Sequence, residues 1–342
     1  MSDQIRVGIL GCAQIAKRSL APAFLGHPAF ELVAIGSRSV EKARSFIKAL
    51  NEQQLGCRAR IASYDDLLRM PDVDLIYCPL PTGMHFEWVM RALKAGKHVL
   101  CEKSLGCNAA EVSDMVSAAR DRKCFLMESF QFRFHAQNLY VKDLLRRNAI
   151  GQIKQLVVRF GVPPFPDGAS NIRYSAELGG GALLDNGAYT VKCTTYLIGH
   201  DVEVLAAMEG CAAEGLGSVS LAGSIMMSVR AAQDLNPSTI HPVCVQTAYG
   251  FDHFYQNGYE LWGTTGKIST ARAFTARMNF AAPVVLETNQ GREVKVFNDD
   301  HFARLMDYLA ETIPSGDYEH EYQESLLQAR ILEDVSRMGR RK

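Results

Sequence analysis

The sequence has no excess of charge of either sign and no long apolar run. Its 342 residues include 37 Lys+Arg and 37 Asp+Glu, so the formal net charge is zero. Proteins that bind nucleic acid usually carry a basic excess, and this balance argues against such a partner. The longest uncharged stretches are interrupted by Gly, Ser, Asn, Pro and Gln, whereas a membrane span needs about 20 mostly apolar residues. We therefore expect neither a nucleic-acid nor a membrane partner.

Motifs that pair cysteines or bind metal ions are also missing. The nine cysteines, which include Cys211, are scattered, and none form a C-x-x-C pair. There is no H-E-x-x-H pattern and no Cys/His cluster, so the sequence predicts no metal site. No cleavage-site pattern follows the first residues. Together these features predict a cytoplasmic protein with reduced thiols.

The first part of the chain has the pattern of an α/β domain. One hydrophobic core rarely extends past ~250–300 residues, so a chain of 342 residues predicts two domains. Short apolar runs lie at 5–10, 31–35, 73–78, 98–101 and 124–127, and helical periodicity lies between them at 13–25, 40–50, 85–95 and 109–122. Strands that are apolar throughout and alternate with helices are typical of a parallel sheet buried on both faces. We predict a doubly wound parallel domain over residues 1–128.

The pattern changes near Ser129. Helical stretches lie at 132–147, 180–198, 301–313 and 322–338, and strand candidates lie at 153–161, 202–208, 218–229, 243–249, 258–262, 284–287 and 293–297. Most of these strands follow one another without intervening helices, which predicts a mostly antiparallel sheet with helices on one face. Residues 129–342 are therefore expected to form a second domain of the α+β class.

A tight turn follows the first predicted strand. Gly11, Ala13 and Ala16 take the three fixed places of a G-x-G-x-x-G/A pattern, with alanine in the second. Amide N–H groups and the positive end of a helix dipole at such a turn bind pyrophosphate. The turn predicts a dinucleotide site, whose residues are Gly11, Cys12, Ala13, Gln14 and Ile15. The alternative is an ordinary strand–helix turn.

The end of the second predicted strand indicates which dinucleotide is bound. NAD enzymes usually place Asp or Glu there, on the ribose 2′-hydroxyl. This chain has Ser37, Arg38 and Ser39 instead. An arginine can bind a 2′-phosphate in bidentate fashion, and a serine can donate to it. We therefore predict NADP(H) in preference to NAD(H), the alternative being that Arg38 is an ordinary solvated loop residue.

Three later segments resemble one enzyme family. The first reads Cys-Pro-Leu-Pro-Thr-Gly-Met-His over 78–85 and Ala-Gly-Lys-His-Val-Leu-Cys-Glu-Lys over 95–103. The second reads Met-Glu-Ser-Phe-Gln-Phe-Arg-Phe-His over 127–135, and the third ends in Gly-Gly-Gly-Ala-Leu-Leu-Asp-Asn-Gly-Ala-Tyr over 179–189. They are similar to the Gfo/Idh/MocA family, named for glucose–fructose oxidoreductase and inositol dehydrogenase. The opening turn and Tyr189 resemble its branch of NADP-dependent nucleotide-sugar 3-ketoreductases and dihydrodiol or xylose dehydrogenases.

This resemblance has implications for fold and site. It implies a Rossmann domain, then an α/β domain with a large open sheet. If this open sheet carries an apolar patch, we expect a homodimer or homotetramer. It also implies a nicotinamide cofactor and a sugar-like or polyol substrate. Lys103 matches the lysine of the family's Glu-Lys-Pro motif, here followed by Ser104. Further cofactor contacts are expected at Pro79, Leu80, Pro81, Thr82, His85 and Glu102.

The third segment carries the expected chemistry. Asp185 matches a family aspartate, and Tyr189 stands where many members have histidine. Hydride transfer to a carbonyl leaves an alkoxide that needs a proton, and a tyrosine beside a lysine ammonium can supply one. Our hypothesis gives Tyr189 the proton and Lys103 the electrostatic role, while the reverse assignment stays open. Asp185 would hold one of them or bind the sugar.

Several alternatives remain at this point. The helix of Tyr189 can also be read as an amphipathic helix with a solvated stripe. Substrate contacts are expected at Arg133, His135, Arg173 and Tyr189, although lone residues of these types often serve only as hydrogen-bonding groups. We predict an NADP(H)-dependent ketoreductase acting on a sugar or nucleotide sugar. The alternatives are a dihydrodiol or aldose dehydrogenase and a catalytically silent NADP-binding sensor or structural protein.

Overall fold

The chain divides into two compact units. The computed structural model describes residues 4–210, 219–236, 238–276 and 280–339. The first unit comprises Met1–Ser129 and Phe302–Leu326, and the second comprises Phe130–His301 and Leu327–Lys342. The first unit is therefore discontinuous in sequence, because a C-terminal segment completes it.

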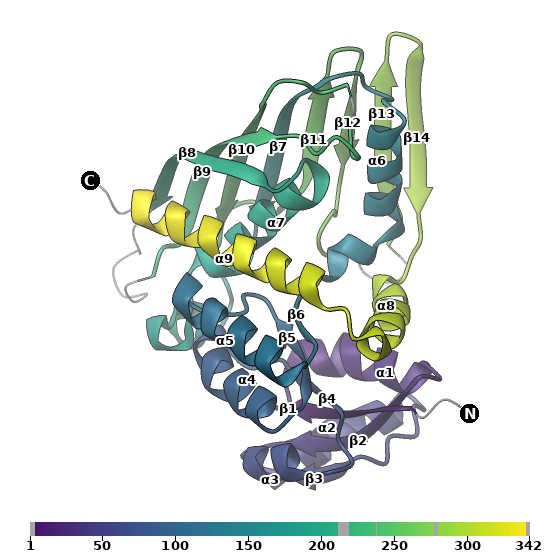
Figure 1. The fold of residues 1–342 in the computed structure, drawn as a ribbon, viewed down its shortest axis with the longest axis vertical. Coiled ribbons are helices and arrows are strands. Elements are labelled where there is room, and N and C mark those ends of the chain that lie inside the picture. The colour runs from purple at the N-terminus through teal and green to yellow at the C-terminus, as the bar shows by residue number, and fades with distance from the viewer. Residues whose placement is uncertain (1–3, 211–218, 237, 277–279, 340–342) are drawn as a thin grey trace. The chain divides into compact units, whose positions relative to one another are not determined.

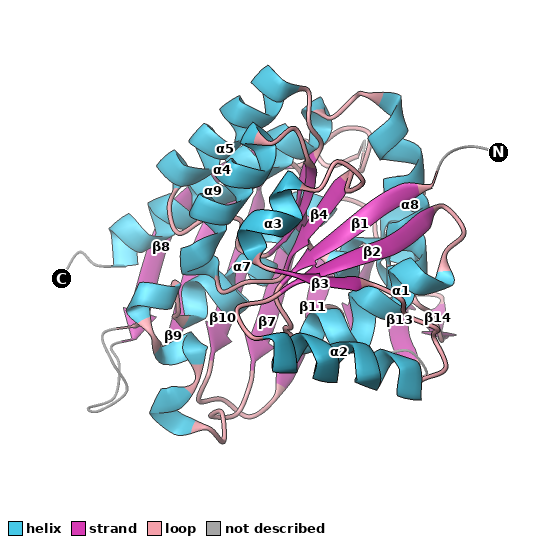
Figure 2. Cartoon of the chain, turned by 90° about the horizontal axis from the view of Figure 1, so that it is seen from below, coloured by secondary structure: helices cyan, strands magenta, loops and turns pink. Residues whose placement is uncertain are grey.

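Six parallel strands form the sheet of the first unit (Figures 1 and 2). They are β1 (Ile5–Leu10), β2 (Phe30–Gly36), β3 (Arg60–Ala62), β4 (Leu75–Cys78), β5 (His98–Glu102) and β6 (Leu126–Ser129). Their order is β3-β2-β1-β4-β5-β6, so the chain reverses its direction of travel between β1 and β4. In doubly wound sheets, ligands bind at the carboxyl ends of the strands at such a reversal.

Helices cover both faces of this sheet. They are α1 (Ala21–Gly26), α2 (Val40–Glu52), α3 (Tyr64–Arg69), α4 (His85–Lys94) and α5 (Ala109–Arg122), with a π-helical turn η1 (Ala16–Leu20) before α1 and a 3-10 turn η2 (Thr82–Met84) before α4. Helices α4 and α5 lie side by side on one face, and α1 and α2 lie on the other (Figure 2). This arrangement leaves the strand ends free to carry the candidate cofactor residues.

The C-terminal segment joins the first unit through α8 (His301–Ser315) and the start of α9 (Glu319–Gly339). The Tyr322 hydroxyl donates to the Cys124 carbonyl oxygen over 2.5 Å. Arg120 forms an ion pair of 2.6 Å with Glu319. The Tyr318 ring packs edge-on against Phe125, with 5.6 Å between ring centroids. These contacts explain why the segment belongs with residues far from it in sequence.

The second unit is built on one eight-stranded sheet. Its strands are β7 (Ile153–Gly161), β8 (Asp201–Gly210), β9 (Ala222–Arg230), β10 (Val243–Gly250), β11 (Gln256–Gly263), β12 (Gly266–Thr270), β13 (Ala282–Thr288) and β14 (Gly291–Phe297). The order is β14-β13-β12-β11-β7-β10-β9-β8, and every neighbouring pair is antiparallel except β7 and β10. The sheet is thus mixed but mostly antiparallel.

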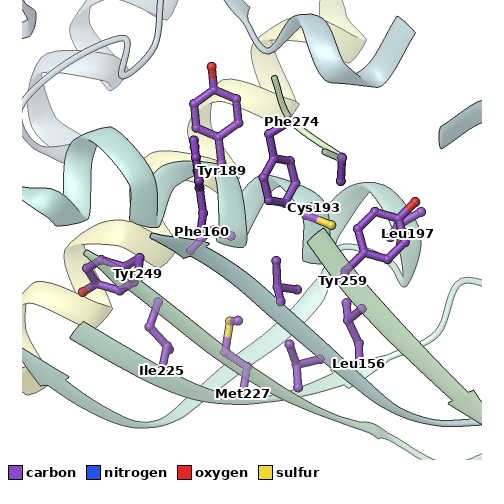
Figure 3. Packing of buried hydrophobic residues seen from close by; sticks show 14 of the residues in the cluster. Leu156, Phe160, Tyr189, Cys193, Leu197, Ile225, Met227, Tyr249, Tyr259 and Phe274 are labelled. Carbon is purple, nitrogen blue, oxygen red and sulfur yellow. The ribbon is translucent and has the colours of Figure 1, made fainter. Parts of the chain in front are cut away.

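Helices cover one face of this second sheet. They include η3 (Gln131–Phe134), α6 (Ala136–Arg146), η7 (Leu183–Gly187), α7 (Ala188–Leu197) and the part of α9 from Leu327 on; three short 3-10 turns, η4 (Gly168–Ser170), η5 (Ile172–Tyr174) and η6 (Ala176–Leu178), precede η7. Apolar side chains of α7, such as Cys193 and Leu197, pack on Ile225 and Met227 of β9 and their neighbours in one core (Figure 3). Alternate residues such as Met226 point away from this core and are exposed.

The predicted fold class is confirmed. A parallel doubly wound sheet forms one unit, and a large, mostly antiparallel sheet covered on one face forms the other. The short elements β3, α3 and β12 were not predicted. The strand expected over 218–229 is β9, while residue 218 and Cys211 lie outside the described residues. No helix in the described ranges is long and apolar enough to cross a membrane.

Candidate active site

The predicted phosphate-binding turn lies at the reversal point of the first sheet. Gly11 follows β1 with φ +102°, a conformation that side chains other than hydrogen rarely adopt. A Cβ there would lie 3.1 Å from Leu80 Cδ2 and 3.4 Å from the Tyr64 hydroxyl. The helix that follows begins at Gln14, and its first N–H groups have no carbonyl partner within the helix. The turn is thus tight and carries no side chain at Gly11, so that its N–H groups can approach a bound pyrophosphate.

The loop after β2 places polar side chains beside this turn. The Ser37 Oγ donates to the Ser39 carbonyl oxygen over 2.8 Å, and the Ser39 Oγ caps α2 by accepting the Lys42 amide. Arg38 is exposed. Burial raises the pKa of Tyr64, and the nearby Arg38 guanidinium, which hydrogen-bonds its hydroxyl, acts in the opposite direction. Burial likewise raises the pKa of Cys12, whereas a hydrogen bond with Ser37 acts to lower it.

These two loops fit NADP(H). The turn at Gly11 carries no side chain, and the space beside its backbone would be taken up if a methyl group were added. The exposed guanidinium of Arg38 follows β2, where an NAD enzyme places a carboxylate. Tyr64 was not predicted as part of this region. It follows β3, a strand of three residues whose apolar run is too short to recognise in the sequence.

The loop after β4 approaches the same edge of the sheet. Pro79, Leu80 and Pro81 follow β4, and Thr82 starts the η2 turn. His85 begins α4 and is fully buried. Its Nε2 lies 2.7 Å from the Leu80 carbonyl oxygen, and its Nδ1 lies 2.8 Å from the Ser104 carbonyl oxygen. A cofactor contact of His85 stays a prediction, but in this arrangement both ring nitrogens already face backbone oxygens.

Lys103 follows β5 and is partly exposed. The residue before it, Glu102, accepts a 2.8 Å hydrogen bond from the Tyr77 hydroxyl. Burial raises the pKa of Tyr77 well above its usual range, and the Glu102 carboxylate adds to this effect. Beyond Ser104, the Leu105 amide donates to the Glu128 Oε1 over 3.0 Å. The peptide bond between Lys103 and Ser104 is cis.

Three buried side chains near this loop are the candidate metal ligands. Ligand atoms of Cys78, His85 and Cys101 lie within 4.8 Å of one another. Burial holds the pKa of the Cys101 thiol well above its usual range, and the adjacent Cys78 contributes. A metal ion would need thiolates and a free imidazole nitrogen, and it would have to replace a backbone hydrogen bond of His85. These contacts disfavour a metal here, and the predicted lack of a metal cofactor stays a prediction.

The candidate catalytic tyrosine lies in the second unit, among aromatic rings. Tyr189 is 5% exposed, and its ring packs against Phe160 at 5.2 Å, Phe130 at 5.3 Å and Phe274 at 5.6 Å between centroids. We call these three rings the aromatic cluster. The tyrosine hydroxyl points away from the sheet (Figure 3). The ring is therefore fixed while its polar end leaves the apolar core.

A polar side chain of the second unit contacts this hydroxyl. Gln131 of η3 donates from its Nε2 to the Tyr189 oxygen over 3.3 Å. Gln131 is itself buried, and its Oε1 has no hydrogen-bond partner among the described residues. The sequence analysis missed Gln131, because a single glutamine between phenylalanines carries no distinctive signal.

The helix of Tyr189 is buried nearly all round. Residues 188–195 of α7 are all buried, including Lys192 at 2% exposure. The alternative of an amphipathic helix with a solvated stripe is therefore wrong. The helix enters through η7, whose Asn186 donates from Nδ2 to the Gly250 carbonyl oxygen over 2.9 Å. A Cβ on Gly180 would lie 2.5 Å from the Arg173 carbonyl oxygen, so the chain can pass there only as glycine.

Asp185 and Arg173 form an ion pair in the second unit. The Arg173 Nε donates to the Asp185 Oδ2 over 2.5 Å, and the guanidinium lies 4.7 Å over the Phe165 ring. The charge of Asp185 raises the pKa of Arg173. The Arg173 side chain remains 39% exposed and that of Asp185 19%. The pair thus presents a fixed cation to solvent next to the tyrosine helix.

The other two predicted substrate residues are more deeply buried. Arg133 is 8% exposed, and its carbonyl oxygen accepts the Tyr196 hydroxyl over 2.9 Å. His135 is 1% exposed and caps α6 by accepting the Gln137 amide at Nδ1. Its ring lies 5.7 Å from that of His301, whose pKa is lowered to about 3 by burial and by His135. Both residues have structural contacts, and their roles toward substrate stay predictions.

The predicted site residues therefore fall into two groups. The cofactor residues and Lys103 belong to the first unit, and Asp185, Tyr189, Arg133, His135 and Arg173 belong to the second. Within the first unit the structure brings the ends of β1, β2, β4 and β5 to one edge of the sheet. Within the second it joins Arg173 to Asp185 and surrounds Tyr189 with the aromatic cluster.

Comparison with known proteins gives consistent matches to one family. Residues 5–130 match the GFO_IDH_MocA model, described as an oxidoreductase family with an NAD-binding Rossmann fold. Residues 138–269 match the GFO/IDH/MocA C-terminal domain. The dTDP-3,4-didehydro-2,6-dideoxy-alpha-D-glucose 3-reductase of Actinomadura kijaniata is 35% identical over 99% of this chain and 97% of its own length.

A solved structure and a further relative extend the comparison. A crystal structure of a 3-ketoreductase from Actinomadura kijaniata, in complex with NADP and TDP-benzene, aligns with a TM-score of 0.87 at 34% identity, covering 98% of each chain. The D-xylose 1-dehydrogenase (NADP(+)) 2 of Haloferax volcanii is 29% identical over 91% of this chain and 89% of its own length. The matches thus cover both units, and the relatives include both a reductase and a dehydrogenase.

Proposed function

Because the chain belongs to the Gfo/Idh/MocA oxidoreductase family, we propose that it is an NADP(H)-dependent ketoreductase. It would reduce a carbonyl group of a sugar or nucleotide sugar to an alcohol. The observation that carries this proposal is Tyr189, whose ring is fixed by the aromatic cluster while its hydroxyl is directed out of the core and contacts Gln131. A phenol held in one orientation in this way suits proton donation to an alkoxide.

The cofactor assignment rests on the first unit. NADPH supplies the hydride when it is bound. The turn at Gly11 would hold the pyrophosphate, and Arg38 with Ser37 would hold the 2′-phosphate. The loop from Pro79 to Thr82 would contact the nicotinamide ribose, because it follows β4 at the reversal point of the sheet. The similar 3-ketoreductase was crystallised with NADP, which supports the same choice here.

Lys103 and Asp185 complete the proposed chemistry. The Lys103 ammonium would stabilise negative charge as it develops on the substrate oxygen, and it would favour the tyrosinate form of Tyr189. Asp185 would orient Arg173 through their 2.5 Å hydrogen bond. The guanidinium, 39% exposed, would then bind a substrate diphosphate with its other N–H groups. The relative crystallised with TDP-benzene supports a nucleoside diphosphate as the group recognised.

A second candidate is the opposite reaction, oxidation of an aldose or diol. It is favoured by the similarity to a D-xylose 1-dehydrogenase that uses NADP(+). The same residues serve both directions, since a tyrosine that donates a proton to an alkoxide accepts one from an alcohol in reverse. A catalytically silent NADP-binding protein remains the alternative of another class.

The experiment is an absorbance assay at the NADPH band with a panel of keto-sugars, nucleotide keto-sugars, aldoses and diols. We expect turnover with a nucleotide keto-sugar and loss of most of it in Lys103→Ala, with NADPH still bound as judged by nicotinamide fluorescence. Oxidation of aldoses or diols alone would favour the second candidate. Bound NADPH without turnover on any substrate would identify a silent binding protein, and failure to bind NADPH would reject the whole proposal.

We also propose a cytoplasmic protein that forms a homodimer or homotetramer. The cysteines in the described part of the chain are all unpaired, as expected in a reducing compartment. The uncovered face of the second sheet carries exposed apolar side chains, among them Met226 at 42% and Trp262 at 43%. Together with the polar residues between them, they would form a self-complementary surface between two copies.

A further inference from the structure

The backbone that carries Lys103 is held by buried side chains from three other strands or helices of the first unit. Tyr77 of β4 donates to Glu102 on one side of the lysine, and Glu128 of β6 accepts from the Leu105 amide on the other. Between these two, the carbonyl oxygen of Ser104 faces the Nδ1 of His85 at 2.8 Å. Residues 102, 104 and 105, on both sides of the lysine, are thus each held by a side chain from another strand or helix.

His85 differs from the other two contacts because it joins two loops. Its Nε2 faces the carbonyl oxygen of Leu80 at 2.7 Å, in the loop proposed to contact the nicotinamide ribose. A carbonyl oxygen can only accept, so the two contacts together need an N–H on both ring nitrogens, which only the protonated imidazolium provides. Burial lowers the pKa of His85, whereas the hydrogen bonds to these two carbonyl oxygens act in the opposite direction. The ring is fully buried, so water cannot replace either contact.

The side chain therefore connects the loop after β4 to the segment after β5 at the edge where strand ends meet. Strands β4 and β5 pair only as far as Cys78 and Cys101, and beyond them the two chains continue as loops. Ladder hydrogen bonds no longer fix their separation there. A ring spanning the two carbonyl oxygens takes over this task.

We propose that His85 is a positioning residue that fixes Lys103 relative to the nicotinamide end of the cofactor, by donating from Nδ1 to Ser104 and from Nε2 to Leu80. It rests on the proposed function, since it assumes that Lys103 works beside a bound nicotinamide. The residue does not touch the reacting atoms. It affects catalysis through the two backbone segments beyond the end of the β4–β5 ladder. A displacement of about 1 Å there can cost roughly a hundredfold in rate.

The test uses two substitutions that each keep one of the two contacts. In His85→Asn the amide nitrogen takes the place of Nδ1 and can still donate to Ser104. In His85→Gln it takes the place of Nε2 and can still donate to Leu80. The full-length variants are compared for NADPH dissociation constant, by nicotinamide fluorescence, and for kcat at saturating NADPH.

We expect the two variants to fail in different steps. His85→Gln should lose roughly ten- to a hundredfold in kcat while NADPH affinity stays near wild type, because the lysine segment is released. His85→Asn should bind NADPH roughly five- to tenfold more weakly while its kcat stays near wild type, because the Leu80 loop is released. Equal losses in both parameters for both variants would overturn the proposal, since a merely structural residue gives that result.

A half-buried histidine of the same unit supplies the matched control. His98 of β5 accepts the Phe125 amide at Nδ1 over 2.9 Å and contacts neither loop. His98→Asn keeps an acceptor at that position, so we expect a change in thermal unfolding temperature at most, with kcat and NADPH affinity near wild type. If His98→Asn reproduced the split seen at His85, the assignment would be overturned.

Two measurements on the wild-type protein do not depend on the variants folding. Nitrogen-15 spectra of labelled histidine should show protons on both Nδ1 and Nε2 of His85, since the contacts with Ser104 and Leu80 each require one; a neutral ring with a single N–H would overturn the proposal. Metal analysis should find no stoichiometric zinc, whereas zinc bound at Cys78, His85 and Cys101 would replace the positioning role with a metal site.

Wild-type protein that binds NADPH but reduces no carbonyl would reject the proposed function, and the NADPH-affinity difference between the variants would still test the Leu80 contact.

Discussion

A single hydroxyl distinguishes Tyr189 from the phenylalanines around it. Because Phe130, Phe160 and Phe274 contact its ring, Tyr189→Phe should fold with the same packing and lose only the proton donor. General acid catalysis contributes roughly 10²–10⁴ in rate, so kcat should fall by about that factor. The measurement is kcat for carbonyl reduction, with the unfolding temperature recorded alongside.

The control for this substitution lies two turns later on the same helix. Tyr196 uses its hydroxyl to contact the Arg133 carbonyl oxygen, and Tyr196→Phe should retain near wild-type turnover. A Tyr189→Phe enzyme with unchanged kcat would assign the proton to another group, with Lys103 the first to test.

Arg38 determines cofactor preference in our proposal. It is exposed in the loop after β2, between Ser37 and Ser39, where an NAD enzyme would have a carboxylate that repels a 2′-phosphate. Removing a charge-assisted bond worth about 1.5–3 kcal/mol should lower kcat/KM for NADPH roughly ten- to a hundredfold in Arg38→Ala. The value for NADH should change little. Arg44→Ala, an exposed arginine of α2, should leave both values unchanged, and a parallel fall for NADPH and NADH at Arg38 would contradict the assignment.

The candidate site could be predicted from the sequence where several residues act together. The turn around Gly11 and the segment ending in Tyr189 are recognisable because glycines and polar residues recur at fixed spacing. Gln131 and Tyr64 were missed because each contributes one side chain from an unremarkable stretch. The fully buried position of His85 was also not foreseeable, since its two carbonyl partners are 5 and 19 residues away and carry no side-chain signal.

At the scale of elements, an ion pair connects β1 to the chain entering β4. Arg6 donates to Asp74 over 2.7 Å, and this hydrogen bond lowers the pKa of the Asp74 carboxyl. A lowered pKa in the folded state stabilises the fold above the unfolded pKa of about 3.9, and this contribution is lost as pH falls through the folded value. Asp74→Asn should therefore be less stable than wild type at pH 7. The difference should shrink as acid protonates the wild-type carboxyl.

Urea unfolding of both proteins from neutral to acid pH measures this difference. In an Arg6→Gln background the same substitution at Asp74 should change the free energy of unfolding little at any pH. A difference between Asp74→Asn and wild type that stayed constant into acid would show that the ion pair does not carry it.

The elements of the first unit could be predicted because parallel strands buried on both faces leave continuous apolar runs. β1, β2, β4 and β5 have this property, and the predicted runs overlap all four. β3 and β12 have three and five residues, and partly exposed side chains weaken their pattern. The burial of the helix that carries Tyr189 could not be predicted for the opposite reason. This helix is buried nearly all round, and its polar residues occupy core positions.

At the scale of the whole molecule, the uncovered sheet face predicts self-association. Trp262 of β11 is 43% exposed there, and its Nε1 contacts Glu260, which pairs with Arg159. Large aromatic side chains at the centre of an interface often contribute 2 kcal/mol or more, so Trp262→Glu should raise the dissociation constant of the assembly by at least about tenfold. Light scattering across a dilution series measures it. A monomeric wild-type protein would reject the predicted oligomer.

The discontinuity of the first unit affects how the chain is made. A ribosome releases residues 1–129 first, but Phe302–Leu326, which complete the same unit, emerge only after residues 130–301 of the second unit have been synthesised. At about 5–20 residues per second, this is a delay on the order of ten seconds or more. Throughout it, Phe125 lacks the ring of Tyr318 and the Cys124 carbonyl lacks the hydroxyl of Tyr322. During this delay the first unit lacks part of its packing. A chain interrupted late in translation would therefore leave the first unit incomplete as well as the second.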